Sequence, residues 1–404
     1  MKSDLASNNR TRRPRIFMMD LWATVPYYTA YLSKALLADG VDLTVGSITY
    51  YLDTDCFTSR GIKVNPGLLN FAGRFQLPRL PRIVLKLAES MLNLSALAIR
   101  FLFYPPDVVH VQYLPMLKLR VPLELWFLEY CRRRRAKIIL TVHDLMPHDT
   151  AESYKQTFHE LYASVEGIIC HSDNIKKRLC VEFDVAEEKI SVIPHGPFFY
   201  DLPKSADSAI LQTFEVDPGK KMILWQGIIF PYKGIDLLLS AWQKVEATDD
   251  SVYLIIAGTG APELLDQIRK QIVVLGLKHV ELHFRFITTE ELVALYRAAD
   301  IVVYPYRAIT TSGALATGLA LGKTIVASDL PVFREALKDR ENARLVNVEQ
   351  TKDFASVLVE LAQDTEQRMR LAEKVRDMNF GDGTWQNIAR ETYTTYLKFL
   401  EDRI

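Results

Sequence analysis

The sequence predicts an α/β protein with two Rossmann-like domains that face each other across a cleft. Short apolar segments typical of buried parallel strands alternate with amphipathic helical segments along the chain. The 404 residues are more than one hydrophobic core usually supports. The strand-like segments also fall into two series, separated by a Pro- and Asp-containing stretch near residues 197–219. Ligands of such folds usually bind at the carboxyl ends of the strands, so we expect a site between the domains.

The two series of strands set the domain boundaries. The first series lies at 15–20, 41–48, 107–112, 137–142, 167–170 and 190–194, with helices such as Tyr27–Ala38 and Pro122–Arg135 between the strands. The second lies at 221–227, 252–258, 280–284, 300–305 and 324–329. We therefore predict a disordered lead-in at 1–14, an N-terminal domain at 15–197, a C-terminal domain at 198–380 and a final segment at 381–404. The amphipathic helix Trp385–Leu400 in that segment is expected to pack back on the N-terminal domain.

Composition excludes several classes of protein. There are 49 basic and 49 acidic residues, a balance that argues against a general nucleic-acid binder. The four cysteines lack metal-binding spacing and are expected to be reduced, as in a cytosolic protein. The polar start of the chain lacks the apolar core of a signal peptide, and no apolar run is long enough to predict a transmembrane helix.

Three motifs of the second domain combine glycine with a helix start. In 224–242 a buried strand runs into Gly227, and Lys233 follows just before a helix. In 254–263, Gly258 follows the next strand. Taken alone, the first is equally an ordinary loop with a solvated lysine, and the second an ordinary tight turn. Glycine allows close backbone approach, and a lysine beside a helix N-terminus can hold a phosphate.

The third motif, "YRAITTSGALATGLALGK" at 306–323, has small hydroxyls at a helix start and no acid. The free amides around Thr311, Ser312 and Gly313, with the positive end of the helix dipole, make an anion site. Plain N-capping by Thr or Ser is the alternative. Two such termini in one domain, with Lys233 between them, favour a nucleotide diphosphate as the ligand.

Two features of the first domain complete the set of candidates. His143 and Asp144 follow the strand 137–142, at the edge that faces the cleft, where a histidine can bind a sugar hydroxyl or transfer a proton. A simple loop cap explains them equally. The segment 74–103 is strongly apolar and basic, and it is either an interfacial helix on an anionic membrane or a buried helix with snorkelling cations. The run "RRRRAK" at 132–137 is expected to be a solvated helix end.

These motifs, in this order, resemble the family 4 glycosyltransferases, retaining enzymes with the twin-Rossmann architecture called GT-B. The blocks that carry the resemblance lie within roughly 107–340 and include "TVHDLMP", "CHSDNIKKRL", "VIPHG", "QGIIFPYKGID", "LIIAGTG", "EELVALYRAADIVVYPY" and "ALGKTIVASDLP". The stretch "PYRAITTSGALATGLALGK" is similar to a polysaccharide-assembly branch with a PYR…TSG signature. Relatives of that kind are mannosyl- or glucosyltransferases that act on polyprenyl-diphosphate-linked oligosaccharides.

The resemblance implies a function and a set of partners. It implies transfer of a hexose from GDP-mannose or a UDP-sugar to a lipid-linked oligosaccharide or polysaccharide precursor, with retention and with no metal or other cofactor. The protein would be cytoplasmic and peripheral at the inner face of the plasma membrane, bound through 74–103, with no nucleic-acid partner.

The resemblance also gives roles to residues. It assigns Gly227, Gly258 and Thr317 to nucleotide binding and places the backbone of Phe286 and Ile287 near the base. Lys233 and the amides of Thr311–Gly313 would stabilise the leaving diphosphate, and we add Arg307 to them as a second cation. His143, with Asp144, would contact the donor sugar or the acceptor.

The sequence departs from the family pattern at three positions. Two glutamates usual in the family fall on Ile309 and Thr317, so the ribose must be held differently, and a loop arginine falls on Ile228. The alternative is therefore a non-catalytic nucleotide-sugar-binding or scaffold subunit. Retention of Lys233 and His143 favours the enzyme. An NAD enzyme is disfavoured because no GxGxxG follows the first strand, and an epimerase on this fold has no specific support.

Overall fold

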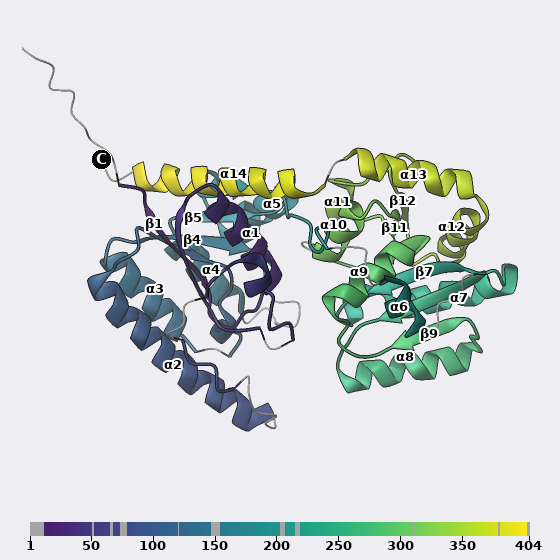
Figure 1. The fold of residues 1–404 in the computed structure, drawn as a ribbon, viewed down its shortest axis with the longest axis horizontal. Helices are drawn as coiled ribbons and strands as arrows, with labels where there is room; N and C mark the ends of the chain where they lie inside the picture. The colour runs from purple at the N-terminus through teal and green to yellow at the C-terminus, as the bar shows by residue number, and fades with distance from the viewer. Residues whose placement is uncertain are drawn as a thin grey trace, which may run out of the picture.

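The computed structural model contains two parallel β-sheets, each covered by helices, in two domains that lie side by side (Figure 1). It describes residues 12–50, 52–64, 68–72, 79–119, 121–146, 154–202, 207–214, 219–309, 312–378 and 380–401. The prediction of two facing Rossmann-like domains is confirmed. The lead-in expected at 1–14 lies mostly outside the described residues.

The sheet of the N-terminal domain is formed by the six strands predicted for it. In spatial order they are β2 (Asp42–Ser47), β1 (Arg15–Asp20), β3 (Val108–Val111), β4 (Lys137–Val142), β5 (Gly167–Cys170) and β6 (Ile190–Val192). The helices of this domain are α1 (Pro26–Ala38), α2 (Arg79–Phe103), α3 (Leu123–Arg133), α4 (Lys155–Ser164) and α5 (Asp173–Phe183). The four central strands, β1, β3, β4 and β5, are buried on both faces, which explains their continuous apolar runs in the sequence.

The C-terminal domain repeats this arrangement with a second six-stranded sheet. Its order is β12 (Arg344–Val346), β11 (Thr324–Ser328), β10 (Ile301–Tyr304), β7 (Lys221–Gln226), β8 (Val252–Ala257) and β9 (Val280–His283). The helices are α6 (Asp207–Gln212), α7 (Ile235–Thr248), α8 (Pro262–Leu275), α9 (Thr289–Ala298), α10 (Gly313–Ala320), α11 (Pro331–Arg334), α12 (Thr351–Gln363) and α13 (Thr365–Asp377).

Strand β12 and helix α6 are among the elements of the C-terminal domain that were not predicted. Strand β12 is only three residues long and pairs with β11 at the sheet edge, so its pattern is too short to stand out. Helix α6 lies within the stretch interpreted as a linker. It packs on α9, where Arg297 pairs with Asp207 at 3.3 Å, so this part of the stretch belongs to the domain.

Strand order determines where a ligand can bind. In the second sheet β7 lies between β10 and β8, so the chain leaves neighbouring strands β7 and β10 in opposite directions. The carboxyl ends of such strands border an open crevice, the usual ligand site of doubly wound sheets. The loops after β7 and β10 carry Lys233 and Gly313, and both lie at this switch point.

The last helix returns to the N-terminal domain, as predicted. Helix α14 (Asp382–Glu401) runs along α1 and the sheet of that domain (Figure 1). The Trp385 indole N–H donates to the Pro197 carbonyl at 2.7 Å, and the Tyr396 hydroxyl lies 2.6 Å from His110 Nδ1. The chain therefore crosses between the domains twice, before α6 and before α14.

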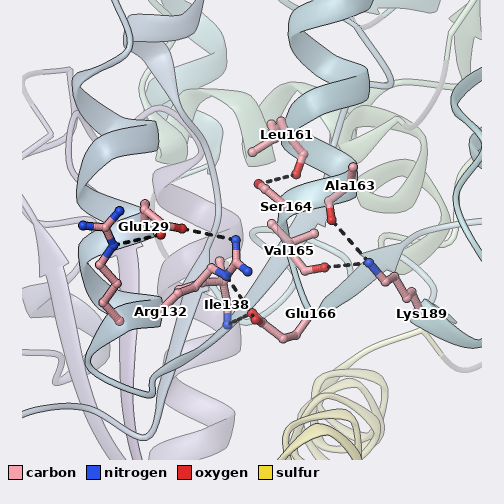
Figure 2. Close-up of polar contacts among 10 residues, drawn as sticks. Glu129, Arg132, Ile138, Leu161, Ala163, Ser164, Val165, Glu166 and Lys189 are labelled. Atoms are coloured by element: carbon pink, nitrogen blue, oxygen red, sulfur yellow. Dashed lines mark hydrogen bonds and ion pairs between the residues drawn. The ribbon is translucent and has the colours of Figure 1, made fainter.

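The basic run at 132–137 ends a helix, as expected. Arg132 and Arg133 lie in the last turn of α3, and both pair with Glu129, at 3.3 and 3.0 Å (Figure 2). Arg132 also lies 3.4 Å from Glu166, which accepts from the Ile138 amide at 2.8 Å. These contacts give the run a structural role.

Helix α2 has an apolar face that is exposed among the residues that the structure describes. Leu80, Val84 and Ile99 are 75%, 66% and 60% exposed, although all are large aliphatic residues. The opposite face is buried in the domain through Leu94 and Leu97. In the described part of the chain, no helix has the length and apolarity needed to cross a bilayer.

Candidate active site

A hollow of about 290 Å³ lies between the domains at the carboxyl end of β7. It contains six of the predicted nucleotide-binding residues: Gly227, Gly258, Phe286, Ile287, Gly313 and Thr317. The N-terminal domain and the crossover that follows it add four aromatic residues: Tyr27, Tyr50, Phe198 and Phe199. We call this hollow the donor pocket. Among the described residues that line it, none is Asp or Glu.

Glycine is required where two loops of the pocket touch. Gly227 and Gly258 follow neighbouring strands, and both have φ of 151°, a conformation that L side chains rarely adopt. A Cβ at position 258 would lie 1.9 Å from the Gly227 carbonyl oxygen. The two backbones are therefore in contact, and this contact forms the floor beside the nucleotide-binding residues.

Lys233 brings a positive charge to the edge of the pocket. It ends a short 3-10 turn, Pro231–Lys233, which Gly234 closes with φ of 66°. A methyl group at position 227 would come within 2.8 Å of the Lys233 ammonium. The ammonium lies 5.9 and 5.7 Å from the rings of Trp225 and Tyr306, and no carboxylate of the described residues lies within 4 Å of it. Burial lowers the pKa of Lys233 to about 8.

Arg307 does not join Lys233 in the donor pocket. Its guanidinium donates to both oxygens of Asp236, at 2.7 and 2.6 Å, and lines a different hollow. The cation that does line the donor pocket is Arg285, which sequence reasoning missed. Arg285 is held by Glu291 through two contacts of 2.7 and 2.8 Å.

The helix start predicted from the third motif, at 306–323, is present as the N-terminus of α10. Ser312 is its N-cap, and the Ser312 hydroxyl accepts from the Leu315 amide at 3.1 Å. Gly313 is close to the end of the N-terminal domain and the crossover, because a Cβ there would lie 3.4 Å from the His195 ring and 2.8 Å from the Phe198 ring. The Thr317 hydroxyl donates to the Gly313 carbonyl at 2.9 Å. Thr311 lies outside the described residues.

His143 belongs to a group of histidines at the facing edge of the N-terminal sheet. Its Nε2 lies 3.1 Å from the Gln112 side-chain oxygen, and its Nδ1 lies 3.4 Å from His171 Nε2. The His171 ring is 5.1 Å from the His195 ring, which in turn lies next to Gly313. His143 and Asp144 also line a small apolar hollow of about 40 Å³. His171, His195 and Ser312 border another hollow, of about 580 Å³, between the domains.

Burial keeps these rings neutral. It lowers the pKa of His143 well below its ordinary value, and the neighbouring His171 and His195 lower it further. Burial likewise lowers the pKa of His171 to about 4 and that of His195 to about 3. A neutral imidazole donates from one ring nitrogen and accepts at the other. Because the two ring nitrogens of His143 already face Gln112 and His171, a bound hydroxyl would replace one of these contacts.

Comparison with known families identifies both halves of the chain. The family model "Glycosyltransferase Family 4" matches residues 25–196, and "Glycosyl transferases group 1" matches residues 208–378. The chain belongs to the family 4 glycosyltransferases. The two crossovers, the facing sheets and the returning C-terminal helix are those of a GT-B glycosyltransferase.

Individual relatives of this glycosyltransferase are distant. An uncharacterised glycosyltransferase of Methanocaldococcus jannaschii is 26% identical over 62% of this chain, and a phosphatidyl-myo-inositol mannosyltransferase of Mycolicibacterium smegmatis is 29% identical over 44% of it. The aligned regions span 65% and 44% of those relatives. The structure of Anabaena HepE with UDP and glucose superposes with a TM-score of 0.70 at 17% identity, over 95% of this chain and all of that one.

The pocket residues that follow strands in this glycosyltransferase were predicted from the sequence. The pocket residues that only tertiary packing brings to the site were not. Tyr27, Phe198 and Arg285 line the donor pocket, yet none stands in a motif. A signal did exist for His171 and His195, because each follows a predicted strand at the same sheet edge as His143. Among the described residues, no group of three or more His, Cys, Asp or Glu has an arrangement that could hold a metal ion.

Proposed function

We propose that this glycosyltransferase moves a hexose from a nucleoside-diphosphate sugar to a hydroxyl of a lipid-linked glycan, with retention of anomeric configuration. The proposal rests on the environment of Lys233. This half-buried ammonium has no carboxylate partner among the described residues, and it lies beside a pocket to which both domains contribute. An uncompensated buried cation is unfavourable by itself, so a bound anion is its natural partner.

The pocket suits a diphosphate. The N-terminus of α10 presents free amides near Gly313, and neither Asp nor Glu appears among its described lining residues. As the bond between the anomeric carbon and the diphosphate oxygen breaks, negative charge grows on the diphosphate. Lys233 and the α10 amides stabilise that charge, which is the kind of interaction that accelerates a reaction most.

The acceptor completes the reaction. Its hydroxyl oxygen forms the new bond to the anomeric carbon on the face that the diphosphate leaves, and its proton passes to the departing phosphate oxygen. The protein then needs no general base. The neutral His143 binds a hydroxyl of the donor sugar or the acceptor, with Asp144 beside it, and the domains close around both substrates.

The exposed face of α2 supports an acceptor held at a membrane. Large aliphatic side chains repeat along this face, and Arg79, Arg82 and Arg100 belong to the same helix. Such a helix can lie in the interface of an anionic bilayer. The name of the M. smegmatis relative describes a phosphatidyl-inositol acceptor, and the Anabaena structure contains UDP and glucose. Both are compatible with the proposed substrate classes.

The first test is calorimetric titration of the purified protein with UDP, GDP and ADP. We expect one nucleotide to bind, and Lys233→Ala to weaken its binding by roughly 10²-fold or more because the charged partner is lost. Lys270→Ala, which removes an exposed lysine of α8, is the matched control and should bind as the wild type does. No binding of any nucleotide to the wild type would contradict the donor site. Binding without sugar transfer or slow donor hydrolysis would support a non-catalytic subunit.

A further inference from the structure

A second hollow opens on the C-terminal domain beside the loop that carries Lys233. Its volume is about 460 Å³, and the donor pocket and this hollow are lined by different residues of the same loop. The polar and aromatic residues that line it are Phe230, Tyr232, Asp236, Gln267, Gln271 and Arg307. Ile268 and Leu264 of α8 contribute apolar surface. The proposed transfer reaction leaves this hollow without a role.

An aromatic pair forms one side of the hollow. The rings of Phe230 and Tyr232 are stacked, with centroids 5.7 Å apart and planes 12° apart. Phe230 is 36% exposed, a large fraction for a phenylalanine in a folded domain. The pair is held in place, because the Arg307 amide donates to the Tyr232 carbonyl at 2.7 Å and the Tyr306 ring meets Tyr232 edge-on. A flat, fixed aromatic surface of this kind can stack against the C–H face of a ligand.

Planar polar side chains form the rest of the lining of this hollow. Arg307 is bound to both Asp236 oxygens, and Gln271 donates to the Asp236 carbonyl at 2.9 Å. The Gln267 side chain is exposed on α8. Arg307 is neutralised by Asp236, and Glu349 lies 3.5 Å from it, so the rim has no excess positive charge. That balance disfavours a phosphate or nucleotide and leaves donors and acceptors that suit hydroxyl groups.

We propose that this hollow binds a pyranose unit of a neutral glycan chain, with the sugar's C–H face on Phe230 and its hydroxyls on Gln267, Asp236 and Arg307. This inference rests on the proposed function, since the glycan would be part of the acceptor, away from the end that receives the hexose. Phe230 lies three residues before Lys233, so the hollow and the lysine beside the donor pocket belong to the same loop. The site would favour long acceptors over short ones.

The test uses soluble oligosaccharides as probes, mannotetraose and maltotetraose, with saturation-transfer NMR on the full-length protein. We expect at least one of them to bind, and Phe230→Ser to weaken that binding about tenfold, the order expected for a lost stacking contact. Gln267→Ala should weaken it by a smaller factor. Val273→Ser is the matched control, because Val273 is 80% exposed on α8 and does not line the hollow.

Nucleotide titration of the same preparations separates the two proposals. If the wild type binds a nucleotide but neither oligosaccharide, the glycan site is overturned while the donor site stands. If no nucleotide binds, the proposed function fails first. Oligosaccharide binding that Phe230→Ser and Gln267→Ala leave unchanged would also overturn the glycan site. The glycan site would also be overturned if Phe230→Ser lost vesicle binding and not oligosaccharide binding, since the ring would then be a membrane contact.

Discussion

Lys233 connects the fold to the proposed chemistry through its protonation state. Burial lowers its pKa to about 8, so the free protein loses the ammonium as the pH rises through that value. A bound diphosphate favours the charged form and raises the pKa in the complex. Nucleotide affinity should therefore be nearly full below about pH 7 and fall roughly tenfold by about pH 9, because binding must then take up a proton.

Calorimetry across this pH range measures the effect. Lys270→Ala should keep the decline, and Lys233→Ala, which has no amine to protonate, should bind weakly with little dependence on pH. A decline of equal size in Lys233→Ala would show that another group titrates and that Lys233 is not the phosphate partner.

A second prediction concerns the substitution of Gly258. Its Cβ would lie 1.9 Å from a backbone oxygen, which cannot move aside as a side chain can. We expect Gly258→Ala to destabilise the C-terminal domain by about 1–3 kcal/mol and to abolish nucleotide binding. Denaturant unfolding and titration measure the two effects.

Gly276 provides the control for this substitution. It also has positive φ, 66°, but no atom lies within 4 Å of the Cβ position. Gly276→Ala should cost stability through backbone strain alone and keep nucleotide affinity. Equal losses of affinity in the two variants would contradict the importance of the Gly227–Gly258 contact.

Some residues of the site could be predicted from the sequence, and others could not. Gly227, Gly258 and Gly313 could be predicted because each follows a strand, and the ends of neighbouring parallel strands meet at one edge. The partner of Arg307 could not, because Asp236 lies 71 residues before it and their pairing depends on how two loops fold together. The aromatic side of the donor pocket likewise depends on domain packing.

At the scale of elements, the strands were predictable because burial on both faces produces continuous apolar runs. Eleven of the twelve strands were predicted, with ends that differ by a residue or two, although β2 and β9 are only partly buried and are not continuous apolar runs. Helix α2 is different, because its sequence fits both a buried and an interfacial helix. In the structure Leu80, Val84 and Ile99 are exposed, so this helix is not buried on all sides.

This exposed face gives a prediction for membrane binding. Val84→Asp with Ile99→Asp should sharply reduce binding to vesicles that contain anionic lipid, because charged groups do not enter the interface as aliphatic ones do. Both side chains are exposed, so the melting temperature should change little. Vesicle co-sedimentation measures the binding.

Val273→Asp with Val274→Asp, on the exposed surface of α8, is the matched control for α2. Equal vesicle binding by both double variants and the wild type would contradict a membrane role for α2. Removing Arg79, Arg82 and Lys86 together tests the electrostatic part. Lys86 lies 4.6 Å above the Trp22 ring, so we expect the arginines to contribute more.

At the scale of the whole molecule, the two domains meet directly at the donor pocket. Asp53 of the N-terminal domain accepts from the Tyr27 hydroxyl at 3.0 Å and from the Thr289 hydroxyl of α9 at 3.3 Å. Tyr27 and Thr289 both line the pocket. One carboxylate therefore joins the domains across the mouth of the site, and closing the cleft and completing the pocket become the same event.

Loss of this carboxylate should loosen the closed arrangement. We expect Asp53→Ala to weaken nucleotide binding about fivefold, which corresponds to roughly 1 kcal/mol for a lost hydrogen bond to a charged group offset by new solvation. Small-angle scattering should show a larger radius of gyration in the presence of nucleotide than for the wild type, because more molecules remain open. Asp55→Ala is the control, since Asp55 is an exposed acid of the same loop and its side chain accepts from the Thr58 hydroxyl within that loop. If Asp53→Ala and Asp55→Ala behave alike in both measurements, closure does not depend on the contact between Asp53 and α9, and the domains must be held by the crossovers and the aromatic residues around Phe198 alone.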